Sequence, residues 1–158
     1  MTKLDRIDRR ILAELQSDAT ISNLELAERV GLSPSPCSRR VRQLQERGLI
    51  DRTVTLLNRD KLDLTLTIYI QVHMANQLTK TLQNFELRVS EFDEVQECAL
   101  VTGSDADYLL KVVMPDMAHY EKFLLKQLNQ IDGVASIRTS FVLRQVLSRT
   151  ELPLKHVN

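Results

Sequence analysis

The sequence predicts an α+β chain of two domains, with short helices first and a β-α-β-β-α-β arrangement after them. Two observations support this fold class. Apolar residues recur at helical spacing from residue 4 to residue 48, and they alternate strictly over residues 65–75. A length of 158 residues also suits two small domains. We therefore expect a first domain over residues 1–56, a polar linker over 57–64 and a second domain over 65–158.

The first domain begins with two predicted helices. The first runs from about Asp5 to Asp18 and is capped by Asp5. Its apolar residues share one face: Leu4, Ile7, Ile11 and Leu15. Ser22 and Glu25 have the spacing of a capping box at the start of the second helix. Gly31 is predicted to end that helix in the left-handed conformation.

A third helix follows after a tight turn. Ser33 is placed to cap it, Pro34 suits its first turn, and Gly48 is predicted to close it. Three of its residues fall on one face and should be buried: Cys37, Val41 and Leu44. Residues 49–56 are apolar and β-branched, which predicts a short wing strand. The domain is therefore predicted to be a winged helix-turn-helix.

The open face of the third helix carries arginines and serines. In a helix-turn-helix this helix enters the DNA major groove, and residues near its start reach base edges. We expect Ser35, Ser38 and Arg39 to read bases, whereas Arg40, Arg42, Arg47 and Arg52 are expected to contact phosphates. The full set of candidate DNA-contacting residues is Ser33, Ser35, Pro36, Ser38, Arg39, Arg40, Arg42, Gln43, Arg47 and Arg52. The alternative is a solvated basic face on an ordinary helical hairpin.

Charge and composition narrow the function classes. The formal net charge is zero, but residues 33–52 hold five arginines against Glu46 and Asp51. A local basic face on a chain whose other residues are mildly acidic fits a DNA-binding domain joined to another domain. The cysteines and histidines form no metal-ligand spacing or nucleophile–base pattern, so we expect no metal, no cofactor and no catalysis. The absence of a signal-like or membrane-length segment predicts a cytoplasmic protein without a membrane partner.

The second domain alternates strands and helices. Its predicted elements, in order, are a strand over 65–75, a helix over about 78–89, strands over 95–102 and 107–114, a helix capped by Asp116, and a strand over 134–146. The turn between the middle strands is predicted over 103–106. This order is that of a ferredoxin-like domain, with both helices on one face of an antiparallel sheet. Apolar residues on both strand faces, notably Tyr108, Phe141, Val142 and Leu143, predict that the far face makes dimers.

Five segments resemble the Lrp/AsnC (leucine-responsive, feast/famine) family of transcription regulators. They are 4–12 (LDRIDRRIL), 26–50 (LAERVGLSPSPCSRRVRQLQERGLI), 100–112 (LVTGSDADYLLKV), 115–123 (PDMAHYEKF) and 133–143 (GVASIRTSFVL). The resemblance covers nearly the whole chain in register. It implies double-stranded DNA as a partner, dimers formed through the second domain, association into octamers and a nucleoid-associated location. It further implies an amino-acid effector bound between neighbouring dimers.

The same resemblance implies where the effector binds. Family members build the pocket from a G-x-x-D turn and the last strand. The corresponding residues here are Leu100, Thr102, Gly103 and Asp107, with Thr139, Ser140, Phe141 and Val142 opposite. Asp105, Tyr108 and Met117 complete the candidate set, because a carboxylate can accept the effector's ammonium and Met117 can add a pliable wall. An apolar, non-aromatic pocket favours L-leucine or L-methionine.

One departure from the family pattern leaves an alternative open. Three residues, not two, separate Gly103 from Asp107, so either Asp105 replaces Asp107 beside the ligand or the turn bulges to keep Asp107 in place. The segment 103–106 also has the composition of a plain hairpin turn. Three other functions compete with an amino-acid sensor: an architectural DNA-compacting protein, a sensor without operator specificity, and an enzyme on a ferredoxin-like fold.

Overall fold

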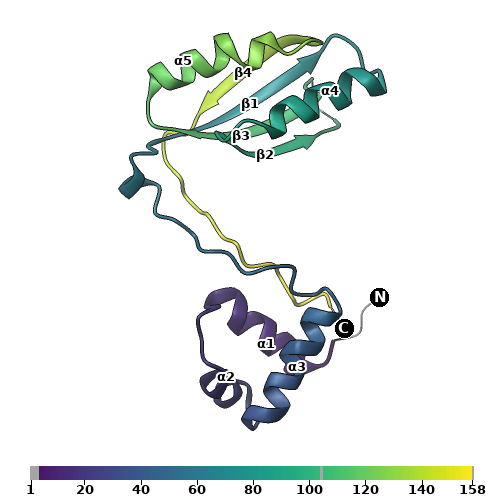
Figure 1. Ribbon diagram of the computed structural model, residues 1–158, viewed down its shortest axis with the longest axis vertical. Helices are drawn as coiled ribbons and strands as arrows, with labels where there is room; N and C mark the ends of the chain where they lie inside the picture. Colours follow the sequence, from purple (N-terminus) through teal and green to yellow (C-terminus); the bar gives the residue numbers. More distant parts are fainter. Residues whose placement is uncertain (1–3, 104, 158) are drawn as a thin grey trace. The chain divides into compact units, whose positions relative to one another are not determined.

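A computed structural model describes residues 4–103 and 105–157 of the chain (Figure 1). Contacts divide the chain into two units. The first contains the residues up to Leu56 together with those from Leu147 onward, and the second is Leu57–Val146. The sequence had suggested that residues 65–158 form one domain. The structure instead groups the last residues of the chain with the N-terminal helices.

The first unit contains three helices: α1 (Arg6–Ser17), α2 (Asn23–Val30) and α3 (Pro34–Glu46). A full capping box begins α1, because the Asp8 amide donates to Asp5 Oδ1 at 2.7 Å and the Asp5 amide donates to Asp8 Oδ2 at 3.4 Å. At α2 the Ser22 hydroxyl accepts from the Glu25 amide at 3.2 Å, whereas the Glu25 carboxylate binds Arg29 instead of returning to the cap.

The turn between α2 and α3 follows the prediction except at the cap of α3. Gly31 ends α2 with a φ of 77°, a left-handed conformation that favours glycine. Ser33 occupies the N-cap position of α3 without a side-chain cap bond, and Pro34 is the first residue of that helix. The predicted apolar faces meet in one core, made of Leu4, Ile11, Leu12, Leu26, Ala27, Val30, Cys37 and Leu44. The helix-turn-helix predicted from spacing is therefore present.

The segment after α3 differs from the prediction. Residues 49–56 do not form the wing strand that their composition favours. A strand needs a partner for its backbone groups, and the four strands of the described chain all lie in the second unit. The side chains of Val54 and Leu56 remain exposed.

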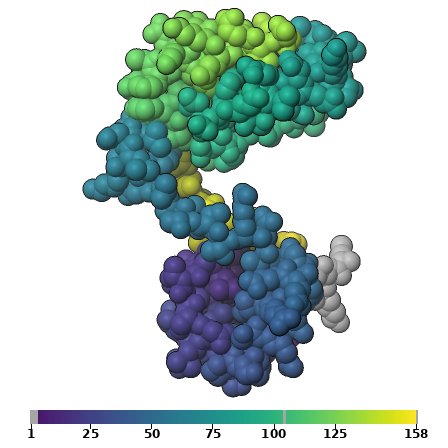
Figure 2. Space-filling view, viewed as in Figure 1, coloured from purple at the N-terminus to yellow at the C-terminus, as the bar shows by residue number. Residues whose placement is uncertain are grey.

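The C-terminal segment is part of the first unit's packing. The Leu152 amide donates to Gln16 Oε1 at 2.7 Å, and Gln16 Nε2 donates back to the Leu152 carbonyl at 3.3 Å. Arg9 Nη1 donates to the Val157 carbonyl at 2.8 Å. Leu154 and Val157 pack against the helical core. In Figure 2 part of this segment, in yellow, is visible at the surface of the purple and blue first unit.

The second unit has the predicted β-α-β-β-α-β order. Its elements are β1 (Leu66–Met74), α4 (Thr79–Ser90), β2 (Val95–Leu100), β3 (Tyr108–Met114), α5 (Met117–Lys126) and β4 (Val134–Phe141). A short 3-10 turn at Asp60–Leu62 precedes β1, and another at Leu128–Gln130 follows α5. The antiparallel sheet has the strand order β2-β3-β1-β4, and α4 and α5 cover one of its faces (Figure 1). Fold class and topology are those predicted.

The two faces of the sheet differ sharply. Alternate residues of β1 and β3, such as Ile70 and Leu110, pack with Phe85 and Phe123 of the helices into a buried core. The residues between them, on the other face, are Thr67, Tyr69, Gln71, His73, Leu109, Lys111 and Val113, and Arg138 of β4 pairs with Gln71.

Two of the residues that we expected on an apolar far face, Tyr108 and Phe141, therefore lie on the other side of the sheet. Tyr108 is only 1% exposed and lies in the core, and Phe141 contacts Tyr120 of α5 on the helix side. The last strand also ends at Phe141 and not at Val146. Its last ladder pair is Ile68 with Phe141, and beyond it the Val142 amide donates to the Thr67 carbonyl at 2.9 Å.

Candidate functional site

The exposed face of α3 forms a shallow hollow together with the start of α2. Its lining residues are Asn23, Pro34, Ser35, Ser38, Arg39, Arg42, Gln43 and Glu46. The structure thus brings together five predicted DNA-contacting residues: Ser35, Ser38, Arg39, Arg42 and Gln43. Ser33 and Pro36 lie at the start of the same helix but do not line the hollow.

Three lining residues were not among the predicted DNA-contacting residues: Asn23, Pro34 and Glu46. Asn23 Nδ2 donates to the Pro34 carbonyl at 2.9 Å, which joins the first residues of α2 and α3. Glu46 lies at the end of α3, where its Oε1 accepts from Arg42 Nε at 2.8 Å. An asparagine directly after the Ser22 cap and an Arg–Glu pair four residues apart were the signals that could have revealed Asn23 and Glu46.

Arg40, which we expected to contact a phosphate, forms ion pairs with two carboxylates of the first helical segment. Its Nη1 contacts Asp5 Oδ2 at 2.6 Å and Asp8 Oδ1 at 2.7 Å, and its side chain is only 30% exposed. These bonds raise the pKa of Arg40. The pKa of Asp5 is lowered, first by the Asp8 amide and then by Arg40. The residue therefore fastens α3 to the start of α1.

Two other predicted clamps have different surroundings. Arg47 is the C-cap of α3, with its backbone amide bonded to the Gln43 carbonyl. Arg52 lies beyond the helix with a side chain 79% exposed, and its nearest carboxylate is that of Asp51 at 4.0 Å. An exposed arginine beside the recognition helix retains the freedom to meet a phosphate.

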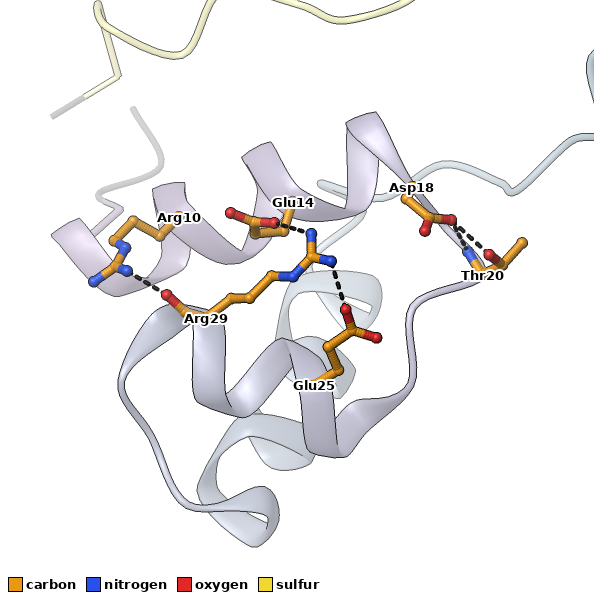
Figure 3. A network of polar contacts seen from close by, with 6 residues as sticks. All are labelled: Arg10, Glu14, Asp18, Thr20, Glu25 and Arg29. Carbon is orange, nitrogen blue, oxygen red and sulfur yellow. Dashed lines mark hydrogen bonds and ion pairs between the residues drawn. The ribbon is translucent and has the colours of Figure 1, made fainter.

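A polar network fixes α2 against α1 (Figure 3). Arg29 Nη1 contacts Glu14 Oε2 at 2.9 Å while its Nη2 contacts Glu25 Oε1 at 2.5 Å, and both bonds raise the pKa of Arg29. Arg10 donates to the carbonyls of Arg29 and Val30, which are among the orphan acceptors at the end of α2. The helix that precedes α3 is thereby held in a defined position.

A second hollow lies in the other unit, at the turn between β2 and β3. It is lined by Gln77, Leu82, Leu100, Val101, Thr102, Gly103, Asp105, Ala106 and Asp107. Gly103 has a φ of 82°, which explains glycine at this position. Ser104, also in the predicted turn, lies outside the described residues. The hollow brings together Leu100, Thr102, Gly103, Asp105 and Asp107 of the predicted ligand set.

Asp107 is tied into the sheet. Its Oδ2 accepts from the Met74 amide and its Oδ1 from Gln77 Nε2, both at 2.7 Å. These two bonds, the Met74 amide first, lower the pKa of the Asp107 carboxyl. Its backbone amide also donates to the Val72 carbonyl at 3.0 Å. Asp107 is therefore an ionised carboxylate in a fixed position, despite the extra residue after Gly103.

The remaining predicted ligand residues lie elsewhere in the unit. Thr139 Oγ1 bonds the Tyr120 hydroxyl at 2.6 Å, and the Phe141 ring is 5.2 Å from that of Tyr120. Ser140, Val142 and Met117 likewise do not line the turn hollow. Tyr108 is a core residue whose hydroxyl donates to Glu86 Oε1 at 2.7 Å. One chain thus separates most of the predicted set into two groups. The turn group is Leu100, Thr102, Gly103, Asp105 and Asp107, and the β4 group is Thr139, Ser140, Phe141 and the following Val142.

The described residues hold no cluster of three or more potential metal ligands. Within the same residues, no helix is long and apolar enough to span a membrane.

Comparison with known families matches both units. Residues 4–51 match the family described as winged helix-turn-helix DNA-binding. Residues 67–152 match the Lrp/AsnC ligand binding domain.

Individual proteins similar to this chain belong to the same kind of regulator. The leucine-responsive regulatory protein of Escherichia coli K12 is 44% identical over 152 residues, 96% of this chain and 92% of its own length. A transcriptional regulator from Neisseria meningitidis, solved in complex with L-Met, superposes with a TM-score of 0.94 at 36% identity, covering 99% of this chain and 100% of that one. An AsnC family regulator from Agrobacterium tumefaciens gives 0.90 at 40% identity, covering 96% and 97%. With a helix-turn-helix reader on one unit and the matching ligand-binding fold on the other, the chain belongs to the Lrp/AsnC family of DNA-binding transcription regulators.

Proposed function

We propose that this regulator senses an apolar amino acid, L-leucine or L-methionine, and controls genes of amino-acid metabolism. The observation that carries the proposal is the hollow at the β2–β3 turn, where two carboxylates lie beside a glycine and an apolar wall. The L-Met complex of the Neisseria relative and the leucine-responsive name of the Escherichia relative support this class of effector.

The turn offers complementary groups to such a ligand. An ammonium needs an ionised acceptor, and Asp107 is ionised at neutral pH with a lone pair remaining on each oxygen. Asp105 adds a second carboxylate at the same hollow. Leu82 and Leu100 provide aliphatic surface for a side chain, and Gly103 lets a ligand carboxylate approach backbone amides closely.

Assembly completes the site in this proposal. The β4 group of Thr139, Ser140, Phe141 and Val142 does not line the turn hollow of its own chain. We infer that a neighbouring dimer presents its β4 group to the turn, and that dimers assemble into octamers around such sites. On the DNA side, Ser35, Ser38 and Arg39 read bases, while Arg42 and Arg52 contact phosphates.

Thermal melts of the purified protein with each standard amino acid test the effector. A ligand at about one hundred times its Kd adds about 2.7 kcal/mol of stability, a visible shift in Tm. We expect leucine or methionine to raise Tm selectively, and Asp105→Asn and Asp107→Asn to identify the ammonium acceptor. Tight binding of aspartate or lysine without leucine or methionine would contradict the effector. A flat panel, with DNA binding that follows length and salt, would favour an architectural role.

A further inference from the structure

Glu46 is an acidic residue on a surface made to approach a polyanion. It lines the hollow of the recognition helix beside Arg39 and Arg42, and its side chain is 57% exposed. Duplex DNA carries closely spaced phosphates, so a carboxylate on this surface weakens binding to any sequence. The presence of Glu46 on a DNA-binding surface therefore needs an explanation other than affinity for DNA.

Helix stability does not supply that reason. Glu46 is the last residue of α3, where the partial negative charge of the helix end repels a carboxylate. The pair with Arg42 also has the less favourable order, since a glutamate stabilises a helix best when it precedes the basic residue. Both side chains are largely exposed, which limits the value of the ion pair.

The contact with Arg42 has a definite geometry. Glu46 Oε1 accepts from Nε of the guanidinium at 2.8 Å, while the terminal Nη groups remain as further donors. Holding Nε restricts the orientations that Arg42 can adopt toward a passing phosphate. It also offsets the charge of an arginine that would otherwise strengthen contact with every duplex.

We propose that Glu46 is a specificity-determining residue that acts through Arg42: it suppresses phosphate contact on non-cognate DNA more than it weakens binding to the cognate site. On random DNA the pair stays closed, and Arg42 contributes little. On the cognate site, where Arg39 and the serines are engaged, the docked helix brings a phosphate close enough to compete for Arg42. Discrimination is a difference of affinities, and Glu46 increases it by penalising the wrong partner.

The test compares Glu46→Gln with the native chain on two short duplexes, without effector. One duplex is enriched from a random library by the native protein, and the other is a random sequence of the same length. We expect Glu46→Gln to tighten binding to the random duplex by about two- to fivefold. Its dependence of log K on log salt should steepen by about 0.9 for each phosphate gained. Affinity for the enriched duplex should change less, so that the specificity ratio falls.

Two controls isolate the mechanism. Glu91→Gln removes the same charge from a glutamate of similar exposure, which pairs with Arg88 in the second unit, and should leave both affinities unchanged. In an Arg42→Ala background, Glu46→Gln should no longer steepen the salt dependence. Equal tightening on both duplexes, or an undiminished effect without Arg42, would overturn the proposal. So would a loss of affinity confined to the enriched duplex, because Glu46 would then read a base directly.

Discussion

The two units of this chain achieve stability by different means. The second unit, called the sheet unit below, buries a large apolar core around Phe85, Tyr108 and Phe123, between one face of the sheet and two helices. The first unit, called the reader unit below, has a smaller core. It is stabilised in addition by ion pairs of Arg29 and Arg40 and by the packed C-terminal segment. The DNA-binding surface therefore depends on polar contacts and on residues that follow the second unit in sequence. Perturbing each kind of contact should affect one unit and spare the other.

Removing the C-terminal segment should have the largest effect. A chain that stops at Val146 loses the packing of Leu154 and Val157 and the bonds to Gln16 and Arg9. We expect a loss of about 2–4 kcal/mol in the reader unit. Hydrogen exchange should then increase in peptides of α1 and remain unchanged in those of β1 and β3. Leu143→Ala, at a nearly fully exposed position, is the control, and equal deprotection of both units would contradict this division.

Arg40→Met should have the next largest effect. The substitution leaves Asp8, which is nearly buried, without its guanidinium partner. We expect about 1–3 kcal/mol of destabilisation in the reader unit. The salt dependence of DNA binding should be unchanged, because Arg40 contacts carboxylates and not phosphates. A salt slope lower by about one with unaltered stability would restore the phosphate-clamp role.

Arg39 and Arg42 separate reading from clamping. Arg39→Ala should reduce the preference for the cognate duplex by about 1–3 kcal/mol through a lost base contact. Arg42→Ala should lower the salt slope on the cognate duplex by about one, and it should weaken binding to the random duplex less, because Glu46 holds Arg42 there. Fluorescence anisotropy on cognate and random duplexes measures both effects. Because Arg39 and Arg42 lie on an exposed surface, the stability of neither unit should change. If the two variants lose affinity equally on both duplexes, the assignment of roles along α3 is wrong.

Local signals in the sequence were sufficient for much of this architecture. Capping residues and helical spacing predicted α1, α2 and α3, and strict alternation predicted β1. Each of these signals is contained within a few neighbouring residues. The exposed face of α3 could be predicted for the same reason, because helical periodicity fixes which of residues 35–43 share a face once the helix forms.

The features that escaped prediction depend on distant partners. Arg40 meets Asp5 and Asp8, 35 and 32 residues earlier, and Leu152 meets Gln16 across 136 residues. No local pattern encodes such contacts. The side on which Tyr108 lies depends on the register of β3, and a shift of one residue exchanges the two faces of a strand.

Asp107→Asn should have the smallest effect, and it concerns the sheet unit alone. The folded carboxylate has a lowered pKa because the Met74 amide and Gln77 stabilise its charge. Its contribution is therefore present above the unfolded pKa, near 3.8, and is lost as pH falls through the lower folded value. We expect the variant to be less stable at neutral pH by about 1 kcal/mol, with the difference shrinking below about pH 4. Melts of both proteins between neutral pH and pH 3, compared with Asp105→Asn, measure this. A difference that persists at pH 3 would mean that shape and packing at the turn, and not charge, hold Asp107 in place.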